Sequence, residues 1–386
     1  MAQTQPSRQR TCYLDNFRTF LTILVIYHHT SIAYGGEGSV HYVSSHHPRP
    51  YLPLLAFNVV NQSFFMAAFF FLSGYFTSLS ARRKPLKQIL WDRAVRLGLP
   101  TAVYTVVAEP IHMATVRVLI DHRSLDWAIV LDDVKSIRGI RGPVWYCCVV
   151  LIFDTIYAML RTSNPIPTSQ NTKTVITSSR GISASLLCVT ALEFCFRIWH
   201  PIDRVWPLLN VRLGYVPQYA FYYMLGHLTP APLDPFQLAS PSPMLATAGS
   251  LIFTLSLASK VQTQTTTMGP PAKTLDHILS LMMGGRNPIA FAYALLNELM
   301  GYAIFKALLQ IFYKRVDFPL AWSIPHYAYA AFIVHRPVSE LVEAAADAWT
   351  ASAITKTMVL GTVNGVVSWA VAWILVQVPG IKRVIG

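Results

Sequence analysis

Two ionisable residues in the first apolar segment of the chain, Arg18 and His29, have types and a spacing that could support chemistry inside a membrane. They are eleven positions apart, which at about 100° per residue is roughly 20° beyond three full turns, so both side chains fall on one helix face. The residues between them are mostly aliphatic or aromatic. An ionisable pair in hydrocarbon is costly and normally faces a bundle interior or a watery cavity. The spacing therefore predicts a membrane helix that borders a polar site.

The composition is that of an integral membrane protein. Of the 386 residues, 53% are hydrophobic and 13% are charged, whereas soluble proteins carry about 25% charged residues. Apolar runs long enough to span a bilayer, about 20 residues, recur along the whole chain. The first run follows a polar leader, residues 1–12, and no small-residue cleavage site comes after it, so we expect a retained helix. We therefore predict one all-α, multi-pass membrane domain over residues 1–386.

Ten apolar segments are candidates for membrane-spanning helices in a single bundle. They cover residues 14–34, 53–79, 97–113, 144–160, 181–199, 214–228, 243–258, 288–312, 320–337 and 355–378. Polar, turn-rich connections separate them, among them residues 162–180 and 260–286. The five cysteines form no CxxC pair and four lie in apolar runs, which indicates core packing rather than a disulfide scaffold or a metal site.

Basic residues in the short connections predict the orientation, with both termini in the cytoplasm. The inward connections would then hold Arg8, Arg10, Arg82, Arg83, Lys84, Lys87, Lys314, Arg315, Lys382 and Arg383. The outward connections are of mixed charge, and Glu340, Glu343 and Asp347 are expected in one of them. The net charge of +13 is thus mainly a topology signal and an attraction to anionic lipid. We expect no nucleic-acid partner, because no soluble module collects the basic residues.

This orientation places titratable groups from different spans at two depths. His29, Glu109, Glu193 and His335 fall in the outer half of the bilayer, which predicts an outer polar chamber. Arg18, Arg93 and Arg96 fall at the inner boundary, where they would form a basic mouth able to hold phosphates. At about 1.5 Å rise per residue, Arg18 and His29 are roughly 16 Å apart, a depth that a long flexible thioester arm could bridge.

Five short segments resemble, in order, the signature segments of a known family. Residues 13–18 followed by His29 resemble a basic-x10-His signature, and the other four segments are residues 69–76, 93–100, 143–146 and 327–337. Together they resemble the acyltransferase-three family of integral-membrane O-acyltransferases over nearly the whole chain. The likeness departs at Gly142, where many members carry histidine, and at Cys147, where many carry leucine.

The resemblance implies transfer of an acyl group, expected to be acetyl, from acyl-CoA as co-substrate to a hydroxyl. A hydroxyl is a weak nucleophile and needs a base, and histidine is the usual choice. We expect His29 to take the proton, for direct attack on the thioester or through a transient acyl-histidine. Glu109 or His335 would orient the imidazole or bind the acceptor. The acceptor would be a small molecule such as a hydrophobic secondary metabolite, a glycan or a lipid headgroup.

The donor would lie among the basic residues and the motif residues nearest to them. We expect Arg18, supported by Arg93 and Arg96, to bind a CoA phosphate or to stabilise negative charge, and no metal to take part. Ser73 and Trp145 are expected to line the thioester path.

Several neighbouring residues have simpler explanations. His28 is about 100° from His29 around the helix, so we expect it to contact another helix. Asp15 is expected to pair with Arg18 three residues later. Glu298 and Asp154 are carboxylates in apolar segments to which the sequence gives no partner.

Two other classes of function fit parts of the sequence. A membrane isoprenoid cyclase would use a buried acid, here Glu109 or Glu193, and aromatic walls, and it would tolerate loss of Arg18. A transporter would use the charged residues as a relay and often shows inverted internal repeats, which the sequence lacks. The ordered motifs favour acyl transfer over both.

Overall fold

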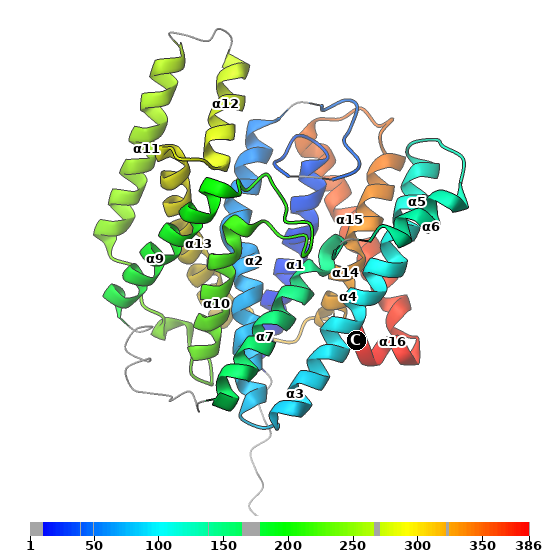
Figure 1. The fold of residues 1–386 in the computed structure, drawn as a ribbon, viewed down its shortest axis with the longest axis horizontal. Helices are drawn as coiled ribbons and strands as arrows, with labels where there is room; N and C mark the ends of the chain where they lie inside the picture. The colour runs from blue at the N-terminus through cyan, green and yellow to red at the C-terminus, as the bar shows by residue number, and fades with distance from the viewer. Residues whose placement is uncertain are drawn as a thin grey trace, which may run out of the picture.

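The fold is a bundle of helices. The computed structural model describes residues 11–38, 40–48, 50–137, 139–163, 178–265, 271–321 and 324–385. Within those ranges the regular secondary structure is helical, apart from one isolated bridge between Trp206 and Val211. Figure 1 shows α1 and α2 inside the bundle, with α3 and α16 at one end and α5 and α6 at the other.

The helices follow the chain as the hydrophobic pattern predicts, with short 3-10 and π segments between some of them. In order they are α1 (Cys12–Ile32), α2 (Leu52–Ala81), α3 (Leu86–Arg93), η1 (Ala94–Gly98), α4 (Leu99–Val103), η2 (Tyr104–Ala108), α5 (Glu109–Leu119), α6 (Trp127–Lys135), η3 (Gly142–Val144), α7 (Trp145–Ser163), α9 (Ser179–Trp199), η4 (Leu213–Tyr215), α10 (Val216–Leu228), η5 (Pro235–Gln237), α11 (Pro243–Thr265), α12 (Pro271–Met283), α13 (Pro288–Arg315), α14 (Ile324–Ala345), α15 (Ala353–Val376) and α16 (Pro379–Ile385).

Each of the ten predicted spans falls on one of these helices or, for residues 97–113, on a chain of short ones. Within the described ranges, five helical stretches are long and apolar enough to cross a membrane: α2, residues 142–160, α9, α13 and α15. The all-α class is therefore confirmed. The count of ten and the direction of the chain through the bilayer stay predictions.

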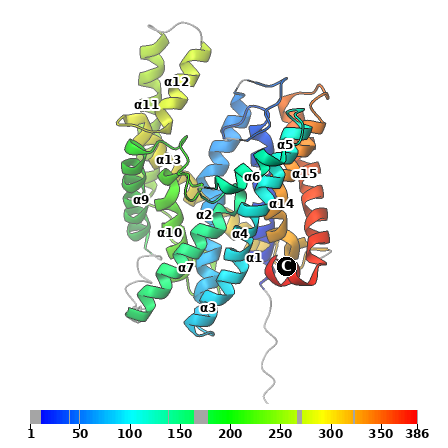
Figure 2. The same cartoon turned by 45° about the vertical axis from the view of Figure 1, so that its right-hand side comes forward.

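The helix α2 is the central column of the bundle. It packs along α10, α13 and α1, and Figure 2 shows it between the α9–α13 side and the α14–α15 side. Gly74 of α2 lies against the backbone of α10, where a Cβ atom would come within 1.9 Å of the Tyr223 carbonyl oxygen. Gly226 of α10 makes the reciprocal approach to Phe71, at 2.0 Å from its carbonyl oxygen. Small residues at such a crossing let two helix backbones approach closely.

Two predicted connections are wrong because helices continue into them. Residues 260–286, expected to be polar and turn-rich, contain the end of α11 and the whole of α12, whose Ile278 is buried. Glu340 and Glu343, expected in an outer connection, are buried residues of α14, which runs on past Pro337. Proline inside a helix removes one backbone hydrogen bond and bends the helix but need not end it.

The third predicted span is a helix interrupted twice by π segments, η1 and η2. Pro100 has no N–H group and so cannot donate to the carbonyl of Arg96, four residues earlier. The Tyr329 hydroxyl of α14 donates to that carbonyl at 2.7 Å. The π segment η1 is thus hydrogen-bonded to α14 at Arg96, within the predicted motif of residues 93–100.

The connection between α1 and α2 is tied down over one end of the bundle by a carboxylate that follows α14. Asp347 accepts hydrogen bonds from the hydroxyls of Tyr42 (2.5 Å), Ser44 (3.1 Å) and Ser45 (3.0 Å). Partial burial raises the pKa of Asp347, but the hydroxyl donors, Tyr42 foremost, outweigh it, so the pKa lies below its ordinary value. The carboxylate is therefore charged at neutral pH and holds the connection.

We predict that Asp347→Ala frees this connection. Amides of residues 40–48 should exchange with deuterium about tenfold faster in the variant, because three hydroxyls lose their acceptor, and exposed Asp121→Ala should leave them unchanged. A carboxyl whose folded pKa is lowered stabilises above its ordinary pKa of 3.8 and loses this contribution as the pH falls through the lowered value. Protection corrected for intrinsic rates should therefore be constant from about pH 8 to about pH 5. Unchanged exchange in Asp347→Ala would contradict the tether.

Candidate active site

A cavity of about 240 Å³ lies among α1, α2, α14 and the segment that begins α7. His29 of α1 and His335 of α14 both line it, with Arg336 and Trp145 beside them. We call it the histidine cavity. Residues Glu37 and Gly38 of the α1–α2 connection also line it, so the tethered connection covers part of this cavity.

The two imidazoles that sequence analysis assigned to one chamber do meet. The rings of His29 and His335 have their centroids 5.2 Å apart, with 40° between the ring planes. His29 is half-buried and His335 is 1% exposed. Helix α1 is unbroken from Cys12 to Ile32, so the predicted shared face of Arg18 and His29 rests on regular helix geometry.

His28 contacts another helix, α2, as the sequence predicted. It also lines the histidine cavity, and its ring lies 4.9 Å from Phe65 and 5.7 Å from His29, measured between centroids. The histidine cavity extends around α1 toward α2, so His28 borders it although it is about 100° from His29 around the helix. His28 is thus a wall of the cavity as well as a helix contact.

Glu109 reaches the same region but through an ion pair. Its carboxylate lies 3.6 Å from the Arg336 guanidinium, and Arg336 is also 3.4 Å from Glu340. The second oxygen of Glu340 contacts His112 at 2.9 Å. Glu109, Glu340 and His112 are at most 4% exposed. Glu109 does not line the cavity, but it compensates the charge of Arg336, which does.

A second cavity, of about 320 Å³, lies at the end of the bundle that carries α3 and α16. Four basic side chains line it: Lys84, Arg93, Arg96 and Arg383. We call it the basic cavity. The predicted basic mouth is thus present as a cavity, and it includes Arg383 from α16, which the sequence treated only as a topology signal. The indole of Trp91, 67% exposed, also borders it.

Asp154, which had no assigned role, is the partner of Arg93. Its carboxylate lies 3.0 Å from Arg93 Nε and accepts hydrogen bonds from Thr77 (2.7 Å) and Tyr223 (2.6 Å). Arg93 Nη2 also donates to Thr77 at 2.9 Å. Asp154 is 1% exposed. Arg93 is therefore held at the inner wall of the basic cavity rather than extended toward solvent.

Arg18 lies close to this cavity without lining it. Its guanidinium is 5.1 Å from the centre of the Phe76 ring and 3.8 Å from Asp15, as the spacing of the two residues predicted. It also interacts electrostatically with Arg93 and Arg96. The three arginines named from the sequence thus lie near one another.

A stripe of α2 connects the two cavities. Met66 lines the histidine cavity, Phe69 and Ser73 follow it, and Thr77 contacts Arg93 at the other end. Ser73 makes a 2.7 Å hydrogen bond with the hydroxyl of Tyr146, and that hydroxyl also donates to the Phe69 carbonyl at 3.1 Å. These residues are three or four apart and therefore share one helix face.

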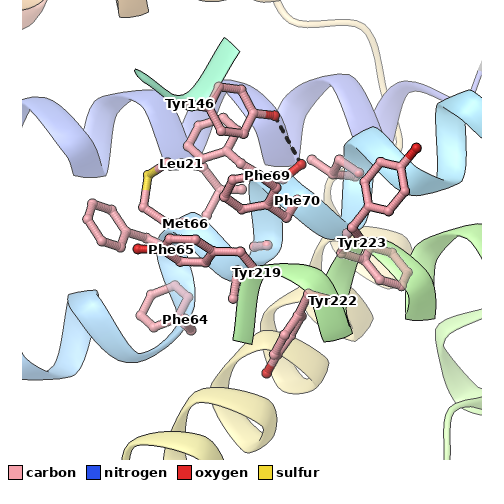
Figure 3. Packing of buried hydrophobic residues seen from close by; sticks show 14 of the residues in the cluster. Leu21, Phe64, Phe65, Met66, Phe69, Phe70, Tyr146, Tyr219, Tyr222 and Tyr223 are labelled. Atoms are coloured by element: carbon pink, nitrogen blue, oxygen red, sulfur yellow. Dashed lines mark hydrogen bonds between the residues drawn. The ribbon is translucent and has the colours of Figure 1, made fainter. Parts of the chain in front are cut away.

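Three aromatic rings fill the space beside this stripe. Phe69, Tyr146 and Phe332 have pairwise centroid distances of 5.7 Å. Phe332 also lines the histidine cavity, and Figure 3 shows Tyr146 beside Phe69 and Phe70 of α2. Of the two motif residues assigned to the thioester path, Ser73 holds Tyr146 in this cluster, whereas Trp145 borders the histidine cavity.

Glu193 does not join the histidine cavity. It forms a 2.7 Å ion pair with Arg197 one turn later in α9, and both side chains are fully buried. Arg197 lies over the rings of Tyr215 and Tyr293, at 5.1 and 5.3 Å. Glu298 accepts from Gln218 at 2.6 Å in the same part of the bundle. The four-residue spacing of Glu193 and Arg197 in one apolar segment is the sequence signal for this separate cluster.

The histidine cavity contains polar residues that sequence analysis did not select. Arg212 and Glu37 form a 3.7 Å ion pair at its wall, and Asn210 donates to the Gly142 carbonyl at 3.3 Å. They come from connections whose residue types resemble any polar loop, so no local signal marks them. Gly142 has φ +63°, and a Cβ there would lie 2.2 Å from the Tyr104 ring. A side chain at this position would therefore not fit unless Tyr104 moved.

Comparison with known proteins agrees with the sequence motifs. The model of a family described as an acyltransferase domain matches residues 13–377. Glucans biosynthesis protein C of Escherichia coli O1:K1 / APEC and its counterpart in strain E24377A / ETEC are each 38% identical to this chain over 92 residues. The aligned part is 24% of this chain and 23% of each relative, so it spans about a quarter of those proteins. No solved structure matches the chain.

We predict that the Arg93–Asp154 pair stabilises the fold. Asp154→Leu should cost about 3 kcal/mol of unfolding free energy, because removing one partner leaves a poorly solvated charge. Adding Arg93→Met to Asp154→Leu should recover most of the loss. Asp92→Leu, which breaks the exposed pair with Lys84, should change stability by less than about 1 kcal/mol. Thermal unfolding in detergent measures all three, and equal effects at Asp92 and Asp154 would contradict the assignment.

Proposed function

The chain belongs to the acyltransferase-three family, and on this premise we propose that it is a membrane O-acyltransferase that moves an acetyl-sized acyl group from acyl-CoA to a hydroxyl. His29 takes the hydroxyl proton. The oxygen attacks the thioester carbonyl carbon, the carbon–oxygen bond forms and the carbon–sulfur bond breaks. The thiolate that leaves receives the proton from His29, so the reaction needs no other co-reactant.

One observation carries the proposal. The unbroken helix α1 places the guanidinium of Arg18 and the imidazole of His29 at opposite ends of the α2 stripe that connects the two cavities. Arg18 lies near the arginines of the basic cavity, and His29 lines the histidine cavity. At about 1.5 Å per residue the two are roughly 16 Å apart along the helix. A donor with an anionic end and a reactive end joined by a long flexible arm matches this separation.

The basic cavity supports a donor that carries phosphate groups. Arginine and lysine side chains are the usual protein ligands of phosphate. Arg96 and Arg383 line this cavity, together with Lys84 in its ion pair with Asp92. The exposed indole of Trp91 offers a flat surface on which a nucleotide base can stack. By the distribution of basic residues, this end would face the cytoplasm, where acyl-CoA is made.

The aromatic cluster supports a short acyl chain. The thioester end must pass or replace the packed rings of Phe69, Tyr146 and Phe332 to reach His29, and the three rings leave little room for a long chain. An acetyl group requires the smallest displacement. The hydroxyl of Ser73 lies on this route and can bond the amide-rich arm of the donor once Tyr146 moves.

The walls of the histidine cavity support an amphipathic acceptor. Glu37, Gln62 and Asn210 provide planar polar groups, and Trp145 and Tyr219 provide ring faces. Such a lining suits a small molecule with both hydroxyls and an apolar face. It also suits a sugar, and the name of the E. coli relatives refers to glucans, so a glycan acceptor is the alternative that the assay must include.

The cyclase and transporter alternatives gain no support from the site. Of the carboxylates that a cyclase would use as acids, Glu109 is ion-paired with Arg336, and Glu193 lies with Arg197 away from the histidine cavity. A paired carboxylate is a poor proton donor.

We predict that His29→Ala abolishes product formation. The rate should fall at least 100-fold, because the base is lost, while His46→Ala, a change in the α1–α2 connection, should retain the wild-type rate. Mass spectrometry of extracts from cells with and without the gene should show a product heavier by one acyl group that disappears in His29→Ala. A wild-type rate in a folded His29→Ala protein would end the proposed mechanism.

We also predict that Arg383→Ala weakens binding of the donor through its nucleotide. The KM for acetyl-CoA should rise about tenfold, since one charge-assisted phosphate contact is removed. Acetyl-pantetheine, which has the thioester arm but no nucleotide, should be used equally well by the variant and the wild type. Lys314→Ala, which removes a basic residue from the end of α13 outside the basic cavity, serves as the charge-matched control. Equal loss with both donors would contradict a phosphate-binding role.

A further inference from the structure

The orientation of the His335 ring is fixed by its own helix. Nδ1 of His335 lies 2.5 Å from the carbonyl oxygen of Phe332, three residues earlier in α14. A carbonyl oxygen can only accept, so Nδ1 must be the nitrogen that carries the hydrogen. In the neutral ring the lone pair is then on Nε2. The structure thus defines which nitrogen of His335 is basic, as a hydrogen bond to one ring nitrogen does in general.

That basic nitrogen is buried and has no hydrogen-bond partner within the described part of the chain. His335 is 1% exposed, and its Nε2 lacks a donor. A buried acceptor without a donor carries a desolvation penalty, so its position requires an explanation. The ring borders the histidine cavity, and the group in contact with it there is the ring of His29, 5.2 Å away between centroids.

We propose that His335 is the positioning residue for His29, with Nε2 of His335 accepting a hydrogen bond from one nitrogen of the His29 ring. The other nitrogen of His29 then carries the lone pair and points to the acceptor hydroxyl. A centroid separation of 5.2 Å allows an N–H···N hydrogen bond when the two rings turn a nitrogen toward each other. The inference rests on the proposed function of His29 as the base.

The arrangement is a three-part chain of the kind that activates nucleophiles in other enzymes. There, a base bound to the nucleophile is oriented by a third group. Here the Phe332 carbonyl fixes the tautomer of His335, His335 fixes that of His29, and His29 accepts the hydroxyl proton. The imidazolium that forms on His29 keeps its hydrogen bond to Nε2 of His335, and the proton leaves from the opposite nitrogen to the thiolate.

The charges around the pair are compatible with a transient cation on His29. Arg336 is the cation next to His335, but Glu109 and Glu340 both contact it, at 3.6 and 3.4 Å. Arg212, on another wall of the histidine cavity, faces Glu37 at 3.7 Å. Both guanidinium charges are thus compensated, which limits the repulsion of a second positive charge in the cavity.

Two conservative variants separate the positioning role from packing. His335→Gln places an amide oxygen near the original position of Nε2, where it can still accept a hydrogen bond from His29. His335→Asn places its amide near the position of Nδ1, so no acceptor remains at the position of Nε2. Transfer of labelled acetyl from acetyl-CoA is measured in native membranes. We expect His335→Asn to lower kcat about 100-fold with KM for acetyl-CoA within about twofold, and His335→Gln to recover at least about tenfold of that loss.

A second readout is independent of any acceptor. Diethyl pyrocarbonate acylates the unprotonated nitrogen of histidine, and fragment mass spectrometry reports modification at His29 separately from His28. We expect His29 to react about tenfold more slowly in His335→Asn than in the wild type, because its tautomer is no longer fixed, and His335→Gln to restore the rate. His326→Asn, in the first turn of α14, is the control and should not change it.

Each outcome decides between the alternatives. Equal kcat and equal His29 reactivity in His335→Asn, His335→Gln and the wild type, with all three folded by thermal unfolding, would overturn the inference. Equal loss in both variants would also overturn it and indicate packing alone. If the wild type transfers no acetyl group, the proposed function fails, and the reactivity of His29 toward diethyl pyrocarbonate still tests the histidine pair.

Discussion

The structure depends on one constraint: a charge inside an apolar helical bundle must have a partner on a neighbouring turn or helix. Arg93 has Asp154, Arg197 has Glu193, and Arg336 has two carboxylates, Glu109 and Glu340. Removing one member of such a pair leaves an uncompensated buried charge. These pairs fix which faces of α3, α7, α9 and α14 point inward, and the walls of both cavities follow from them.

Neutral histidines need no such partner, and the buried carboxylates Glu298 and Glu343 are held by amide donors, Gln218 and Asn364, instead. A neutral imidazole is cheap to bury, so His29 and His335 need no counter-ion and can border a cavity. Glu109 is ion-paired with Arg336, and Glu193 lies with Arg197 away from the histidine cavity. Proton transfer in the proposed reaction therefore falls to imidazole, with the arginines of the basic cavity left to bind an anionic donor.

The stripe of α2 lies between the proposed donor site in the basic cavity and the proposed base in the histidine cavity. The same stretch of α2 also makes the close crossing with α10. Gly74 brings the two helices together one residue after Ser73, whose hydroxyl holds Tyr146 over Phe69. Packing and the proposed route of the acyl group thus depend on the same turn of α2. A motif that is read from the sequence as functional is here partly a requirement of backbone contact.

The sequence alone determined those features that depend on the period of a helix and on residue type. The shared face of Arg18 and His29, the helical class and the positions of ten apolar segments depend only on the period of an α-helix and on residue type. The tertiary structure decided which helices meet: that His335 faces His29, that Asp154 pairs with Arg93, and that Arg383 joins the basic cavity. It also showed α12 and the continuation of α14 past Pro337, where composition suggested connections. These contacts join residues far apart in the chain, and a single sequence carries no signal for pairings that arise only when helices pack.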